Sequence, residues 1–162
     1  MGALSLDQKD RLYQLGMYTE RVFLMCRKFA VCYDKMIETN EEDYEQFCAY
    51  LNVVDTFRSR ADFIHRYCFD EKNQNSIISS LKKAYDCAYE LREIITSEVF
   101  SYIQLAVYAM RRAAYTNNPF IEVQRVVDDI AAFWGMAGAV IENEDVRRTI
   151  ADGREMEKKL QK

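Results

Sequence analysis

Apolar side chains and one threonine recur at alternating steps of three and four residues near the start of the chain. The positions are Leu12, Leu15, Thr19, Val22, Cys26, Phe29, Tyr33 and Met36. Because an α-helix turns once in 3.6 residues, this spacing places all of these side chains on one face. The pattern predicts one amphipathic helix from about Leu6 to Glu38, which ends at the polar pair Thr39-Asn40.

Polar stretches divide the next part of the chain. Acidic residues at 41–43 favour the positive end of a helix dipole, so a second helix is expected to start near Glu41. Its pattern becomes irregular, which predicts a break between Asn52 and Thr56. The polar run 70–75 predicts a loop, and Asn75 or Ser76 is suited to cap the helix that follows.

A long helical pattern begins after that loop. Its inward positions are Ile77, Leu81, Ala84, Ala88, Leu91, Ile95, Glu98, Tyr102, Leu105 and Ala109. The pattern predicts one helix of nearly forty residues, with a kink near Thr96-Ser97 as an alternative, because those side chains compete for local backbone groups. Whether residues 76–115 form one helix or two stays open. Glu98 is the charged residue on this otherwise apolar face, where a carboxylate has to be paired, hydrated or protonated. Glu98 therefore either forms a buried ion pair, turns outward as the pattern drifts, or binds a ligand in a polar pocket.

The last third of the chain predicts two more helices. Asn118-Pro119 is a strong helix start, since asparagine caps the end and proline tolerates the first turn. The apolar positions that follow are Val123, Val127, Ile130, Trp134, Ala137 and Ile141. Small residues at Ala131, Gly135 and Ala139 predict a face that a neighbouring helix can approach closely. Asn143 predicts the cap of a final polar helix.

Composition agrees with an all-helical chain. The 162 residues include one proline and five glycines, which is too few for a loop-rich β fold, and 49% of the residues are apolar. We therefore expect an all-α bundle of about five to seven long, antiparallel, amphipathic helices. The length fits one domain that spans residues 1–162.

The charge pattern and the length of the apolar runs argue against two classes of partner, nucleic acids and membranes. The net charge is -4, with 22 basic against 26 acidic residues and no basic stripe, so we expect no binding to nucleic acid. No apolar run is long enough to cross a membrane, and the first residues do not resemble a signal peptide. We expect no membrane attachment and a cytoplasmic protein.

Metal and cysteine chemistry have little support in the residues. Asp62 and His65 are spaced to share a helix face, but metal-binding helical bundles use several such pairs and this chain has one histidine. The five cysteines include no Cys-x-x-Cys pair, which predicts reduced, buried side chains. We expect no metal site and no cofactor.

A short pattern recurs at the two ends of the chain. Gly16 is followed by Glu20 and Arg21, and Gly153 by Glu157 and Lys158, in the same register. Glycine one turn before glutamate lets a partner helix approach the carboxylate. A solvated face of salt bridges explains the same residues.

Three segments together resemble the bacterial alpha-E domain family, an all-helical group that is largely uncharacterised. Residues 12–21 are similar to the family's Leu-Tyr-x-Leu-Gly-Arg-Tyr-x-Glu-Arg, and residues 69–77 to its Asp-x-x-Asn-x-x-Ser-Ile loop. The helix after that loop, at 84–98, resembles the family's pattern of alanines, arginines and a final Ile-Ser-Ser-Glu. Residues 153–158 resemble a second copy of the opening motif.

The chain also departs from the family pattern. Met17 replaces the motif arginine in the first copy, while Asp152 and Lys158 replace a leucine and an arginine in the second. Family members usually continue past the second copy, so the chain resembles a shortened member. An incomplete bundle could be completed by a second copy of the chain, so self-association into a homo-oligomer is a hypothesis, and the sequence leaves the oligomeric state open.

The resemblance implies a context and a set of residues. Family members are often encoded beside an ATP-grasp-type ligase and a transglutaminase-like protein, which implies a part in making or modifying peptides. Carried over position by position, the candidate binding or buried polar residues are Glu20, Arg21, Asn73, Arg92, Glu98 and Glu157.

These observations favour a helical scaffold or binding module that assists a partner enzyme, because the chain has few groups that could run a reaction. One alternative is an enzyme in which Glu20 and Glu98 converge as acid and base, with Arg21 or Arg92 holding an anionic group. A purely structural homodimer is another alternative.

Overall fold

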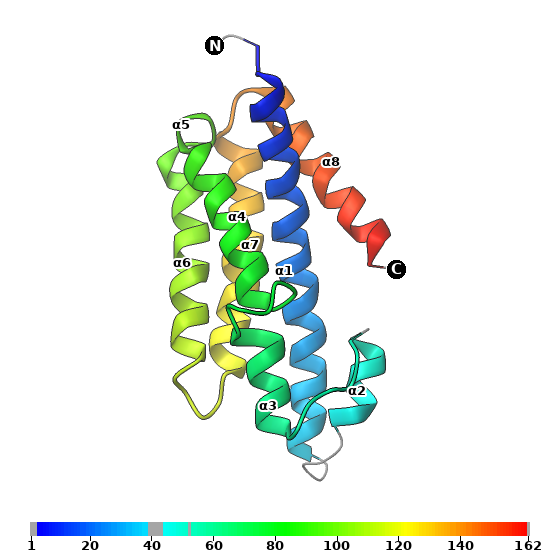
Figure 1. The fold of residues 1–162 in the computed structure, drawn as a ribbon. Coiled ribbons are helices and arrows are strands. Elements are labelled where there is room, and N and C mark those ends of the chain that lie inside the picture. The colour runs from blue at the N-terminus through cyan, green and yellow to red at the C-terminus, as the bar shows by residue number, and fades with distance from the viewer. Residues whose placement is uncertain (1–2, 39–43, 52, 162) are drawn as a thin grey trace.

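The computed structural model describes residues 3–38, 44–51 and 53–161, and these residues form helices joined by short connections (Figure 1). No strand occurs among them, so the predicted all-α class is confirmed. The elements are α1 (Leu6–Glu38), α2 (Tyr44–Tyr50), α3 (Arg60–Ile64), the π-helical turn η1 (His65–Phe69), α4 (Ile77–Glu90), α5 (Arg92–Ile95), α6 (Ser97–Ala113), α7 (Phe120–Val140) and α8 (Glu144–Leu160).

Helix α1 is the centre of the bundle. It has the predicted bounds, Leu6 and Glu38, and it packs against α4, α7 and α8 (Figure 1). All eight side chains of its predicted inward face are buried, among them Phe29 at the middle of the core. The predicted end at 39–40 and the predicted second start at Glu41 lie outside the described residues.

The chain between Ile77 and Ala113 forms a hairpin of helices. Helix α4 ends at Glu90, the single turn α5 follows, and α6 runs back beside α4 (Figure 1). The direction changes at Thr96, whose φ of 80° lies in the left-handed region. One continuous helix is therefore wrong. The expected kink near Thr96-Ser97 has the right position, but the chain reverses its direction there, and α4 already ends at Glu90.

This break changes the phase of the buried face. The continuous pattern predicted inward side chains at positions 98, 102, 105 and 109. Helix α6 instead buries a row that is shifted by one residue, namely Val99, Ile103, Ala106 and Met110. Glu98 and Leu105 are consequently exposed. The prediction that Glu98 lies inside an apolar face is wrong, and the interpretation in which it turns outward is correct.

Three predicted helix starts are present. The hydroxyl of Ser76 accepts a hydrogen bond from the backbone N–H of Ser79, and the side chain of Asn143 accepts from Asp145 and Val146. Asn118 accepts from the N–H of Phe120 at 3.2 Å, which caps α7. Each cap satisfies donors that a helix end leaves without partners.

The small residues of α7 do not meet another helix. Ala131, Gly135 and Ala139 are exposed, and a β-carbon added at Gly135 would have no neighbour within 4 Å among the described atoms. Helix α7 buries the opposite face, which includes Val123, Ile130 and Phe133. The predicted close approach at this face is therefore wrong.

Two further predictions concern the whole bundle. The five cysteines are reduced and buried in the described chain, as predicted. No described helix is both long and apolar enough to span a membrane.

Candidate functional site at the interface of α1 and α8

Helices α1 and α8 run side by side in the same direction and touch through two glycines (Figure 1). A β-carbon added to Gly16 would overlap the carbonyl oxygen of Ile150, and one added to Gly153 would overlap that of Tyr13. The overlapped atoms belong to backbone, which a small side-chain shift cannot move. Glycine is therefore required at both positions, and the close approach that α7 lacks occurs here.

Two buried glutamates follow the glycines by one turn. Glu20 is 2% exposed and its Oε1 accepts a hydrogen bond from Nε of Arg154 at 2.9 Å. Glu157 is fully buried and accepts from Nε and Nη2 of Arg21 at 3.2 and 3.0 Å. Each glutamate thus binds an arginine of the other helix, which offsets the cost of burying its charge.

The two copies of the motif face each other with near twofold symmetry. Gly16 contacts Ile150 and Arg154, and Gly153 contacts Tyr13 and Met17, which are the corresponding positions. The ion pairs break this symmetry. Glu20 binds Arg154, but the position that corresponds to Arg154 is the uncharged Met17, and Glu157 binds Arg21 instead. The second motif copy is therefore a structural counterpart of the first.

Helix α7 covers one side of this interface through Trp134. Its indole N–H donates to the hydroxyl of Thr19 at 3.0 Å, and the guanidinium of Arg154 lies 3.5 Å from the centre of the indole rings. The Thr19 hydroxyl in turn donates to the carbonyl of Leu15 at 2.8 Å. The cation–π contact and the hydrogen bonds hold Arg154 in place beside Glu20.

The sequence reasoning missed Arg154, Trp134 and Gln161 as members of this interface. Gln161 donates to Oε2 of Glu157 at 2.7 Å. The register of the second motif copy could have identified Arg154, because it follows Gly153 directly. No local pattern distinguishes Trp134 from an ordinary core residue.

Asn73 lies in the loop before α4 and closes the end of η1. Its side-chain amide donates to the carbonyl of Arg66 at 2.9 Å, and its side-chain oxygen accepts from the N–H of Asn75 at 3.0 Å. Ser79 donates to the carbonyl of Asn73 at 2.7 Å. These bonds satisfy backbone groups that the irregular π-helical turn leaves open, so Asn73 orders the loop.

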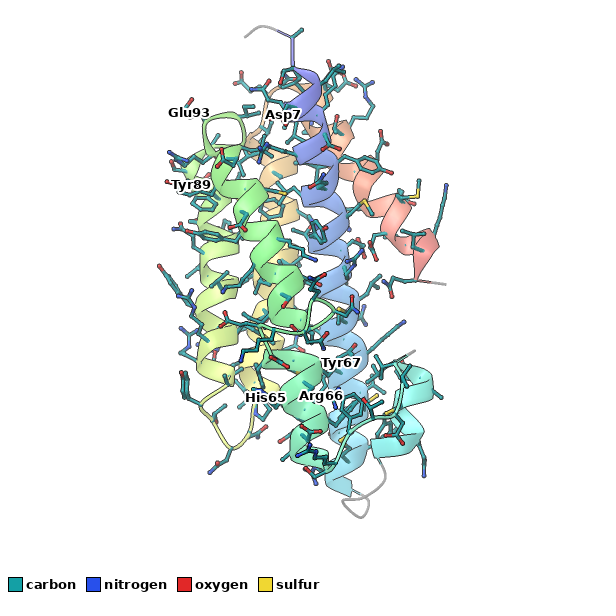
Figure 2. All side chains as sticks on the ribbon, viewed as in Figure 1. Asp7, His65, Arg66, Tyr67, Tyr89 and Glu93 are labelled. Atoms are coloured by element: carbon teal, nitrogen blue, oxygen red, sulfur yellow. The ribbon has the colours of Figure 1, made fainter. Side chains whose placement is uncertain are left out.

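Arg92 and Glu98 lie away from the α1–α8 interface, at the turn between α4 and α6. Both are exposed. Arg92 donates to the carbonyl of Tyr89 at 2.7 Å and its guanidinium stacks on the Tyr89 ring at 4.2 Å. Figure 2 labels Tyr89 at this end of the bundle and His65 at the other.

The predicted convergence of Glu20 and Glu98 is therefore wrong. Glu98 lies in the first turn of α6, where its charge favours the positive end of the helix dipole. The physical reason is the break at Thr96, which turns position 98 toward solvent. Of the six candidate residues, the structure brings together Glu20, Arg21 and Glu157.

Asp62 and His65 form no metal site with other described residues. His65 is exposed, and residues 3–38, 44–51 and 53–161 include no group of three or more His, Cys, Asp or Glu side chains placed for a metal. Asp62 accepts from the N–H of Arg58 at 3.0 Å and pairs with Arg66 at 3.6 Å. The hydrogen bond from Arg58 and the charge of Arg66 lower the pKa of Asp62, so it is an ordinary ionised surface carboxylate.

Comparisons with known proteins add one finding. The model of the Alpha-E family, described as a predicted alpha-helical domain with a conserved ER motif, matches residues 8–161. Glu20-Arg21 is the one Glu-Arg step in the sequence, and it lies at the centre of the interface described above. No curated protein and no solved structure matches the chain.

Proposed function

This chain belongs to the Alpha-E family of helical domains, and from that premise we propose that it is a non-catalytic binding module that assists an ATP-grasp-type ligase in making or modifying peptides. The partner follows from the context that the family resemblance implies. In this proposal the Glu-Arg motif holds the bundle together, and an exposed face of the bundle contacts the ligase.

One observation carries the non-catalytic part of the proposal. A general acid or base has to reach a proton of its substrate. Glu20 and Glu157 are enclosed between α1 and α8, and each is already hydrogen-bonded to an arginine. Both carboxylates are suited to joining two helices, and Glu98 is not near enough to serve as a second catalytic group.

The face formed by α4 and α6 supports the binding part. Tyr89, Leu105 and Tyr108 are exposed there, with Tyr108 at 49%. Beside them is a groove of about 360 Å³ whose lining includes Lys82 and Arg111. Exposed tyrosine and arginine are enriched at the centres of protein interfaces, since they bury a large area and still form hydrogen bonds.

Co-purification with an ATP-grasp-type ligase tests the proposal. The chain and an ATP-grasp-type ligase of the same organism are expressed together and analysed by size exclusion with light scattering. We expect a complex, and we expect Tyr108→Ser to weaken it at least about tenfold. Tyr50→Ser is the matched control, because Tyr50 is equally exposed but lies on α2.

The same measurement separates the alternatives. Absence of a complex contradicts the proposal, and equal effects of the two tyrosine substitutions contradict the choice of face. A chain that elutes as two copies without ligase supports the structural homodimer. An activity of the isolated chain that Glu20→Gln abolishes without unfolding it supports an enzyme.

A further inference from the structure

A pocket of about 290 Å³ opens beside the motif residue Arg21, on the side of α1 that faces η1 and the end of α8. We propose that this pocket binds a carboxylate that bears an apolar side chain, as found at the C-terminus of a peptide or in a free amino acid. The site is separate from the α4–α6 face, so ligand binding here and partner binding there can fail independently.

The pocket has one positive charge in excess. Arg21 is neutralised by Glu157, but it uses Nε and Nη2 for that pair, and Nη1 still carries two N–H donors. Lys28 lies about two turns beyond Arg21 on α1 and lines the same pocket. It forms no ion pair with the described residues. The guanidinium edge and the ammonium group line the same pocket, and both favour a carboxylate.

Tyr67 supplies a second, independent indication of a ligand. It lines the pocket from η1, the residue is 4% exposed, and its hydroxyl forms no hydrogen bond with a described residue. Figure 2 labels Tyr67 on η1 beside α1. The hydroxyl is open to the pocket and can donate a hydrogen bond to a ligand oxygen there. Burial raises the pKa of Tyr67 well above its ordinary value, so the hydroxyl stays protonated and able to donate.

The remaining walls determine the rest of the ligand. Met25, Leu51 and Val53 add apolar surface next to the charged groups, and Asn75 and Gln161 add amide groups. A phosphate group would place its charged oxygens against the apolar side chains of the pocket. A carboxylate that bears an aliphatic side chain places carbon atoms there instead. The volume is at the lower end of the roughly 300–1,000 Å³ of small-molecule pockets, which suits one residue rather than a long chain.

Calorimetric titration of the chain with N-acetyl-leucine tests this site. We expect saturable binding, and binding at least about tenfold weaker for N-acetyl-leucinamide, which lacks the carboxylate. Lys28→Gln is expected to weaken the acid by about tenfold, and Tyr67→Phe by a few-fold. Lys9→Gln, the same substitution at an exposed position of α1, leaves the affinity unchanged.

Thermal melting of each variant checks that the fold is intact. Equal affinity for acid and amide, no saturable binding, or full affinity in a folded Lys28→Gln variant would each overturn the proposal. Free leucine identifies the source of the carboxylate. Binding as tight as that of N-acetyl-leucine points to a free amino acid, and weaker binding points to a peptide terminus, because only leucine carries an ammonium group beside the carboxylate.

Discussion

The residue after each motif glycine decides how the buried glutamates are paired. Arg154 follows Gly153 and reaches across to Glu20. Met17 follows Gly16 and cannot do the same for Glu157, so Arg21 takes that place. In the first motif copy, the cation for Glu157 therefore comes from Arg21, one turn beyond Met17 on the same helix.

Substitutions at these two positions test this account. Arg21→Gln leaves Glu157 buried without a cation, and we expect a loss of about 3 kcal/mol in the free energy of unfolding. Met17→Arg in the same chain supplies the arginine at the symmetric position and is expected to restore most of that loss. Urea denaturation measures both changes.

Lys158 provides the control for this pair of substitutions. It corresponds to Arg21 in the second copy, but its side chain is 42% exposed and pairs with Glu155 on the surface. Lys158→Gln should change the free energy of unfolding by less than about 1 kcal/mol. A double variant no more stable than Arg21→Gln alone would contradict the symmetric placement of position 17.

At the scale of elements, the glycines determine how closely α8 packs on α1. Gly16→Ala forces a methyl group into the backbone of α8, and we expect a loss of about 3 kcal/mol in the free energy of unfolding. Gly135→Ala, in the open face of α7, is the matched control and should increase stability by about 0.5–1 kcal/mol through helix propensity. Chemical denaturation of the two variants should shift in opposite directions.

The turn between α5 and α6 carries backbone strain. Thr96 has φ 80° and ψ 153°, a region that glycine occupies far more readily than threonine. Thr96→Gly should raise the free energy of unfolding by about 1 kcal/mol, because the relief of strain exceeds the loss of its hydroxyl cap on Val99. Thermal melting of the variant and the unchanged chain measures this difference in stability.

Ser76→Gly is the comparison for that substitution. Ser76 also caps a helix, but its φ of -74° is ordinary. Removing its hydroxyl loses the cap and also the hydrogen bond that it donates to the carbonyl of Asp70, so stability should fall by about 1 kcal/mol. If both glycine variants lose stability alike, the left-handed conformation of Thr96 carries no significant strain.

At the scale of the whole molecule, one apolar core contains side chains from all the long helices and the cysteines of the chain. Burial raises the pKa of the Cys32 and Cys87 thiols to about 11, and it raises those of Cys26 and Cys68 as well. Since the thiolate is the reactive form, few of these groups are available near neutral pH.

Thiol labelling at pH 8 tests this description of the core. We expect the folded chain to react slowly at all five cysteines, and the chain in denaturant to react rapidly at all five. The sign follows from the burial of all five thiols and from the raised pKa values of Cys26, Cys32, Cys68 and Cys87, since pH 8 lies below those values. Rapid reaction of one thiol in the folded chain would mean that its part of the core opens.

Helices and their ends were determined by local sequence. The stepping of apolar residues predicted the start of α1 at Leu6 and its buried face, and Ser76, Asn118 and Asn143 predicted three further starts. These features depend on hydrogen bonds and side-chain spacing within a few residues. Short-range patterns contain that information completely.

Contacts between distant segments were decided only by the tertiary structure. The pattern through Thr96 predicted a buried Glu98, but one residue with positive φ reversed the chain and exposed it. The sequence showed the repeated glycine and glutamate, yet their pairing arose because α7 returns the chain so that α8 lies parallel to α1. Helix propensity acts between neighbouring residues, whereas the pairing of Glu20 with Arg154 depends on the packing of three helices.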